Sequence, residues 1–177
     1  FRSPGRSALS FTPTYSMYPL LAEGTGTSYI AVPRGDRFEL TPEYVSAAIL
    51  EHKPAITILC SPNNPTGTPL DIACVSAAYE AVKTFNGILV IDEAYAEFSS
   101  VPSAAALVPQ LPNLIVMRTF SKWAGLAGLR IGYSVAHAEI TNALMAIKQP
   151  YNVNVAADYA ARAALEDAGH LLLISVT

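Results

Sequence analysis

Two cations stand in an otherwise apolar segment of the sequence, TFSKWAGLAGLRIGY at residues 119–133. A charge left unpaired in a packed interior is strongly destabilising, so Lys122 and Arg130 each need a partner from the chain or from a ligand. A lysine shielded from water can present the neutral amine that attacks a carbonyl group and forms a Schiff base. Arg130, with the hydroxyl groups of Thr119 and Ser121 nearby in sequence, offers the donors that bind a phosphate. The segment therefore predicts a ligand with both a carbonyl group and a phosphate.

Two other polar loops follow apolar runs that are typical of buried strands. SPNNPTG comes after AITILC, and DEAY begins at the end of GILVID. An aspartate at the end of a buried strand needs a positive partner, because burial disfavours the charged form of its carboxyl group. Pyridoxal 5'-phosphate would satisfy Asp92 through its pyridinium nitrogen, Lys122 through its aldehyde and Arg130 through its phosphate. The combination predicts a pyridoxal-phosphate site.

The elements that must position these loops alternate between strands and helices. Apolar, β-branched runs predict six strands, at residues 7–11, 27–32, 55–60, 87–92, 114–119 and 129–135. Helical periodicity predicts helices at residues 15–23, 41–51, 71–85, 138–148 and 155–168. This alternation indicates an α/β fold, with a mostly parallel central sheet and helices on both faces. Ligands of such sheets bind at the carboxyl ends of the strands, which is where the three polar loops fall.

The composition is that of a globular chain without a strong charge bias. Its 177 residues are 51% hydrophobic with a formal net charge of -3, and the mean hydropathy is +0.32. One domain with a sizeable core is expected, and no basic surface for nucleic acid or for a membrane. Cys60 and Cys74 have neither metal-ligand nor redox spacing, so we expect no metal site and a reducing compartment. Without a membrane-length apolar run or a signal sequence, we expect a cytoplasmic protein whose partners are small molecules or other subunits.

The three loops, SPNNPTG, DEAY and SKWAGLAGLR, resemble those of the class I/II aminotransferases, which are fold-type I pyridoxal-phosphate enzymes. The similarity runs over nearly the whole chain. It implies that Lys122 binds the cofactor covalently and is the catalytic residue. The resemblance implies further cofactor contacts, which are Asp92 to the pyridinium nitrogen, Asn64 and Tyr95 to the phenolic oxygen, Tyr15 to the ring face, and Thr119, Ser121 and Arg130 to the phosphate.

Within this family, the segments PTYSMY, DEAYAEF and KQPYNVN most resemble those of the members that act on histidinol phosphate. The resemblance implies transamination between histidinol phosphate and 2-oxoglutarate, a step of histidine biosynthesis. An aromatic-amino-acid aminotransferase or a threonine-phosphate decarboxylase could share the same loops, and a non-catalytic fragment is a further alternative. The Asn64–Pro65 bond is expected to be cis, because such loops use it to aim the asparagine inward.

Chains of this family extend beyond the present one in both directions. We therefore expect residues 1–177 to be an incomplete large, cofactor-binding domain of a pyridoxal-phosphate-dependent transferase, without the N-terminal segment and the C-terminal small domain. The full-length protein is expected to be a homodimer that takes a small-molecule amino donor and a keto acid. The isolated fragment is expected to be inactive or weakly active. Ordinary structural roles are expected for four arginines, Arg34, Arg37, Arg118 and Arg162.

Overall fold

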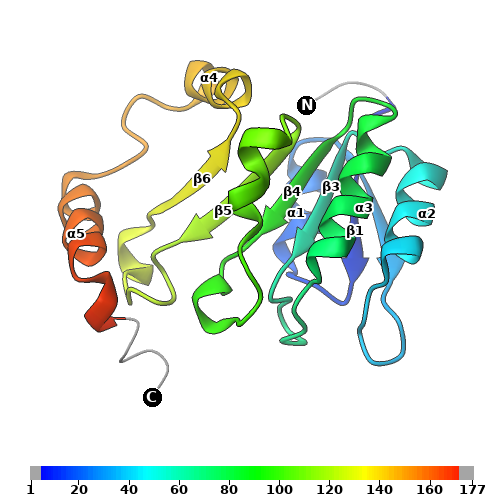
Figure 1. Ribbon diagram of the computed structural model, residues 1–177. Coiled ribbons are helices and arrows are strands. Elements are labelled where there is room, and N and C mark those ends of the chain that lie inside the picture. Colours follow the sequence, from blue (N-terminus) through cyan, green and yellow to red (C-terminus); the bar gives the residue numbers. More distant parts are fainter. Residues whose placement is uncertain (1–4, 172–177) are drawn as a thin grey trace.

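The computed structural model describes residues 5–171, within which six strands form one sheet (Figure 1). The strands are β1 (Ser7–Thr12), β2 (Ser28–Pro33), β3 (Ile56–Cys60), β4 (Ile88–Asp92), β5 (Leu114–Thr119) and β6 (Gly132–Ala136). The α-helices are α1 (Met17–Gly24), α2 (Pro42–His52), α3 (Ile72–Lys83), α4 (Ala138–Ile147) and α5 (Val155–Glu166). Each predicted strand and helix is present, with small shifts at the ends. None of the helices in the described range is both long and apolar enough to cross a membrane.

The sheet has the strand order β2-β1-β3-β4-β5-β6. The first five strands are parallel, and β6 runs antiparallel to β5. Right-handed crossovers put helices on opposite faces when the chain moves in opposite directions across a sheet. The chain moves outward from β1 to β2 and back from β2 to β3, and Figure 1 accordingly shows α1 behind the sheet and α3 in front, where α2 packs against it. The predicted α/β sheet with helices on both faces is confirmed.

The two helices on the front face begin at side-chain caps and close the main core. Thr41 accepts a hydrogen bond from the Tyr44 N–H (3.2 Å) at the start of α2, and Asp71 accepts one from the Ala73 N–H (2.7 Å) at the start of α3. Each such cap contributes about 1 kcal/mol. The sheet residues that are buried beneath these helices are Leu9, Phe11, Leu59, Leu89, Ile91, Leu114 and Val116. Burying each of them contributes about 1.5–3 kcal/mol, so the strands form a firm base for the loops at their ends.

Three short 3-10 helices, which the sequence analysis does not predict, occupy the loops: η1 (Ala96–Phe98), η2 (Ala104–Gln110) and η3 (Ala127–Leu129). Because of η3, the final strand begins later in the sequence than predicted. A strand is expected over residues 129–135, but β6 begins only at Gly132, because Arg130 after η3 adopts a left-handed conformation with φ of 54°. A Cβ atom on Gly132 would lie 2.6 Å from the Arg118 carbonyl oxygen, so glycine permits this close pairing with β5. Because β6 is reversed, its amino end brings Arg130 to the edge where the parallel strands end.

A second, smaller core fixes the segment that carries Lys122. Phe120 and Trp123, on either side of the lysine, are buried and pack with Ala161 and Ala164 of α5. The apolar residues of the segment therefore anchor it to α5, whereas Lys122 and Arg130 are exposed. The expectation that these two cations lie in a packed interior is wrong for this chain, because the aromatic neighbours take the buried positions instead.

Candidate active site

The polar loops meet in one cavity of about 350 Å³ at the edge of the sheet where the parallel strands end. All eight residues that the sequence analysis assigns to the cofactor line this cavity. They are Tyr15, Asn64, Asp92, Tyr95, Thr119, Ser121, Lys122 and Arg130. The other lining residues are Cys60, Ala94, Met117, Arg118 and Ala127. The structure therefore brings the predicted residues together, while the role of each stays a prediction.

One turn, between β5 and β6, supplies the amine, the guanidinium group and two hydroxyl groups of the cavity. The Lys122 Nζ atom lies 5.2 Å from the centre of the Tyr95 ring, which is within the range of a cation–π contact. Thr119 Oγ1 accepts a hydrogen bond from the Ser121 N–H (3.1 Å), and this bond stabilises the turn just before the lysine. Arg130 donates to a carbonyl oxygen of η3 at 2.9 Å. The turn thus concentrates positive charge and hydrogen-bond donors, which suit an anionic group.

Asp92, the last residue of β4, is held by two hydrogen bonds. The Tyr18 hydroxyl donates to Oδ2 (2.7 Å), and the Ala94 N–H donates to Oδ1 (3.1 Å). No ion pair joins Asp92 to a lysine or arginine within residues 5–171, so the positive partner that the sequence analysis expects is not a side chain of the described part. A carboxylate oxygen accepts more than one hydrogen bond, so both oxygens of this cavity-lining residue keep acceptor capacity for a ligand.

The two consecutive asparagines of the loop after β3 have different surroundings. Asn63 is buried, and its side chain donates to the Pro13 carbonyl (3.1 Å) and accepts from the Thr14 hydroxyl (2.8 Å). These bonds tie the loop to the segment that follows β1. Asn64 lines the cavity instead, and the Asn64–Pro65 bond is cis, as the sequence analysis predicts.

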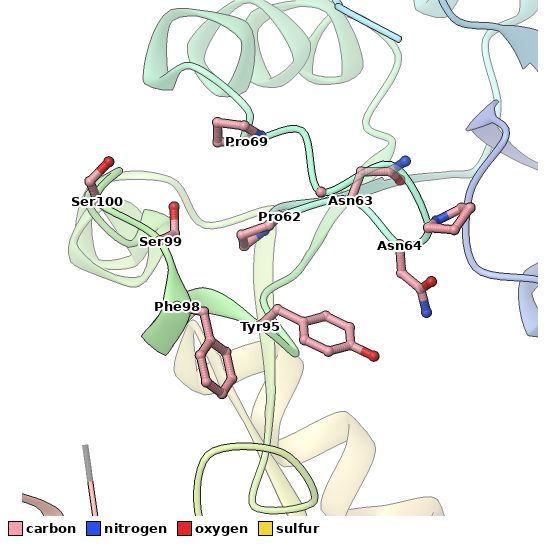
Figure 2. A pocket seen from close by; sticks show the side chains of 10 residues that line it. Pro62, Asn63, Asn64, Pro69, Tyr95, Phe98, Ser99 and Ser100 are labelled. Atoms are coloured by element: carbon pink, nitrogen blue, oxygen red, sulfur yellow. The ribbon is translucent and has the colours of Figure 1, made fainter. Parts of the chain in front are cut away.

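A second hollow of about 500 Å³ adjoins the cavity and shares Asn64 and Tyr95 with it. In Figure 2 the side chains of these two residues extend toward the same region, and Ser99 and Ser100 lie on the other side of the hollow. All residues that line it are uncharged: Pro62, Asn63, Asn64, Pro65, Gly67, Pro69, Tyr95, Phe98, Ser99 and Ser100. Of these two hollows, the charged groups therefore line only the first.

The sequence matches a known family over almost its entire length. Residues 1–171 match the family model described as aminotransferase class I and II. The chain belongs to the class I and II aminotransferase family. The resemblance that the three loops indicate is thereby confirmed.

Individual relatives of this aminotransferase-family chain agree in name and in fold. A histidinol-phosphate aminotransferase of Frankia casuarinae is 47% identical over 175 residues, which are 97% of this chain and 44% of the relative. One of Thermobifida fusca is 44% identical and covers 97% of this chain and 47% of the relative. The crystal structure of histidinol-phosphate aminotransferase from Sinorhizobium meliloti in complex with pyridoxal-5'-phosphate matches with a TM-score of 0.89 at 28% identity, over 99% of this chain and 48% of that one. The chain thus spans about half the length of the proteins it matches.

Sequence reasoning about this aminotransferase-family site missed Tyr18, which donates to Asp92 and is only 4% exposed. Its ring also meets the Tyr15 ring edge to face, with centroids 5.5 Å apart. The signal that could have found it is spacing. Tyr18 follows Tyr15 by three residues, and the Tyr18 N–H donates to the Tyr15 carbonyl oxygen (3.3 Å), so one turn just before and at the start of α1 brings the two residues together.

A buried ion-pair network supports the loop that carries Tyr95. Glu93 is 4% exposed, and its carboxylate accepts from the Arg118 guanidinium and from the Ser103 hydroxyl, at 2.8 Å and 2.6 Å. Arg118 also pairs with Glu97 at 2.8 Å. Burial by itself would lower the pKa of Arg118, but Glu93 and Glu97 raise it above its ordinary value. The two carboxylates flank Tyr95 in sequence, so their shared guanidinium fixes the loop on both sides of this residue.

In this member of the aminotransferase family, Arg118→Met is expected to lower the free energy of unfolding by about 3 kcal/mol, because the variant leaves the Glu93 carboxylate buried without its ion partner. Denaturant unfolding followed by circular dichroism measures the loss. Arg162→Met is the matched control, since Arg162 pairs with Asp158 on the surface, where the side chains are 72% and 50% exposed. The control is expected to lose less than about 0.5 kcal/mol. Equal losses in the two variants would contradict a structural role for the buried network.

Proposed function

We propose that the cavity binds pyridoxal 5'-phosphate and that the chain is the cofactor-binding part of an aminotransferase. The observation that carries this proposal is the composition of one cavity, which collects an amine, a carboxylate, a guanidinium group and several hydroxyl groups from loops far apart in the sequence. These groups match the aldehyde, the ring nitrogen and the phosphate of the cofactor. The family match supports the same assignment, and the relative from Sinorhizobium meliloti is a complex with pyridoxal-5'-phosphate.

The proposed roles follow from the chemistry of each side chain. Lys122 forms the covalent link to the cofactor, and Asp92 holds a proton on the ring nitrogen. The proposed noncovalent contacts of the other residues are Asn64 and Tyr95 to the phenolic oxygen, Tyr15 to a face of the ring, and Thr119, Ser121 and Arg130 to the phosphate.

The proposed reaction moves an amino group from a donor to a keto acid. When bound, pyridoxal phosphate supplies an electron sink for the charge that forms on the α-carbon. The Lys122 amine removes the proton from the α-carbon of the amino donor as a general base, and it returns a proton to the α-carbon of the keto acid as a general acid. Asp92 keeps the proton on the ring nitrogen throughout the reaction. The Lys122 amine lies 5.2 Å from the centre of the Tyr95 ring, so the two proposed cofactor-binding groups are neighbours in the cavity.

The proposed substrates are histidinol phosphate as amino donor and 2-oxoglutarate as acceptor, in histidine biosynthesis. Eight curated relatives with 42–48% identity, from Frankia casuarinae to Rhodococcus jostii, are all named histidinol-phosphate aminotransferase. These names favour histidinol phosphate over the alternatives that share the three loops, an aromatic amino acid or phosphothreonine. A non-catalytic origin is not favoured either, because the cavity keeps Lys122, Asp92 and Arg130.

We also propose that residues 1–177 act as part of a larger, cytoplasmic protein. The chain spans about half the length of its relatives, since it covers 44% of the one from Frankia casuarinae and 47% of the one from Thermobifida fusca. The longer protein would add a small domain that binds the substrate carboxylate, and it would form a homodimer. The chain by itself is then expected to bind the cofactor weakly and to transaminate poorly or not at all.

The test has two arms. Titration of the chain with pyridoxal phosphate, followed by visible absorbance, is expected to give saturable binding with one cofactor per chain. The longer protein that contains this chain is then assayed with histidinol phosphate, phenylalanine and phosphothreonine as amino donors. Histidinol phosphate is expected to give the highest kcat/KM. Absence of saturable binding would overturn the cofactor assignment, and preference for another donor would overturn the substrate assignment alone.

A further inference from the structure

We propose that Tyr18 is a positioning residue that acts on the cofactor through Asp92, by holding the carboxylate in the orientation that meets the ring nitrogen. This inference rests on the proposed binding of pyridoxal phosphate in the cavity. Tyr18 itself is not among the residues that line the cavity. Any effect it has on the cofactor must therefore pass through a neighbour.

The geometry of Asp92 identifies that neighbour. The Tyr18 hydroxyl lies 2.7 Å from Oδ2, a short bond of the kind that a neutral donor forms with a carboxylate. The Ala94 N–H holds Oδ1 at 3.1 Å. With one donor on each oxygen, rotation of the carboxylate about its side-chain bond breaks at least one hydrogen bond. A cavity-lining carboxylate fixed in this way is pre-organised for a ligand.

The direction of the hydrogen bond is also fixed. Burial, followed by the nearby Cys60 and Asp92, raises the pKa of the Tyr18 phenol far above its ordinary value. The phenol therefore keeps its proton and donates it toward Asp92. Burial and Asp92 likewise raise the pKa of the Cys60 thiol, whose strand position is directly opposite Asp92. Tyr18 and Cys60, the two titratable groups next to Asp92, thus both stay neutral.

The same side chain contacts the aromatic residue proposed for the ring face. The Tyr15 and Tyr18 rings meet edge to face, with centroids 5.5 Å apart and an interplanar angle of 83°. Tyr18→Phe keeps this ring contact and removes only the hydroxyl group. The substitution therefore separates the positioning of Asp92 from ring packing.

The experiment compares two ligands, pyridoxal phosphate and its analogue in which a C–H group replaces the ring nitrogen. Dissociation constants are measured through quenching of the fluorescence of Trp123, the only tryptophan of the sequence. Tyr18→Phe is expected to weaken binding of pyridoxal phosphate about tenfold, because Asp92 is no longer held in place for a charge-assisted hydrogen bond to the ring nitrogen. Binding of the analogue is expected to change less than about twofold, because the analogue has no ring nitrogen for Asp92 to meet. Tyr44→Phe, which removes a hydroxyl bond of 2.8 Å to the Pro33 carbonyl away from the cavity, is the control and should leave both constants unchanged.

For each variant, the dissociation constant of pyridoxal phosphate is divided by that of the analogue. A loss of folded protein affects both constants alike, so it leaves this ratio unchanged and cannot produce the expected result. A second variant, Tyr18→His, keeps an aromatic ring with an N–H donor and is expected to recover part of the wild-type ratio. Equal weakening of both ligands by Tyr18→Phe, or no weakening of either, would overturn the inference while leaving the proposed function intact. If the wild-type chain binds pyridoxal phosphate no better than the analogue, Asp92 has no special contact with the ring nitrogen and the inference is wrong. If the wild-type chain binds neither ligand, the proposed function fails as well.

Discussion

Replacement of Lys122 by alanine is expected to abolish covalent binding of the cofactor and to lower transamination by the longer protein at least about a thousandfold. The reason is that the same amine has two proposed tasks, the covalent link and the transfer of the α-proton, and Lys122 is the one lysine among the described residues that line the cavity. Borohydride treatment in the presence of pyridoxal phosphate, followed by peptide mass spectrometry, locates the modified lysine directly. In the wild-type protein the added mass is expected on the peptide that contains Lys122.

The control for this experiment is Lys83→Ala. Lys83 lies at the end of α3 and forms an exposed pair with Glu80, at 3.5 Å. This variant is expected to keep both the modified Lys122 peptide and the activity. Modification spread over several surface lysines, or full activity of Lys122→Ala, would show that the amine of residue 122 is not the attachment site.

Asp92→Asn is expected to lower kcat of the longer protein by roughly 100-fold to 1,000-fold. Asparagine has nearly the same shape and keeps an oxygen that can accept from the Tyr18 hydroxyl, so the variant removes the negative charge with little change in packing. Without this charge the ring nitrogen loses its proton partner, and the electron sink weakens. Steady-state kinetics of both half-reactions measures the loss, and thermal unfolding checks that the fold is kept.

Asp158→Asn provides the matched control for Asp92→Asn. Asp158 lies on α5, where its pair with Arg162 is exposed. The control is expected to change kcat by less than about twofold. An Asp92→Asn variant with wild-type kcat would contradict the proposed role of the carboxylate, whatever its affinity for the cofactor.

The parts of the fold that were predicted correctly are those with a strong local pattern. The buried strands β3, β4 and β5 read as short β-branched runs, and α2 and α3 begin at the capping residues Thr41 and Asp71. That the polar residues after these strands lie close together was then predictable, because parallel strands place their carboxyl ends at one edge of the sheet. Asn64, Asp92 and Lys122 accordingly line one cavity.

The parts that were missed depend on contacts between distant segments. The burial of Phe120 and Trp123 against α5 leaves Lys122 exposed, and no local pattern in the lysine segment predicts which helix covers its aromatic residues. The late start of β6 depends on the left-handed residue Arg130. The bond from Tyr18 to Asp92 joins residues 74 positions apart. Such features follow from the assembled sheet and not from periodicity.

The residues that line the cavity lie after the ends of four neighbouring strands, β1, β3, β4 and β5, and before the start of a fifth, β6. In a partly folded chain, some of these residues would therefore not be in place. A ligand that binds only the complete arrangement shifts the folding equilibrium toward it by mass action. At one hundred times its dissociation constant, such a ligand adds about 2.7 kcal/mol to the stability. Melting temperature should therefore rise with the concentration of pyridoxal phosphate, and the size of this rise reports whether these five strands are correctly assembled.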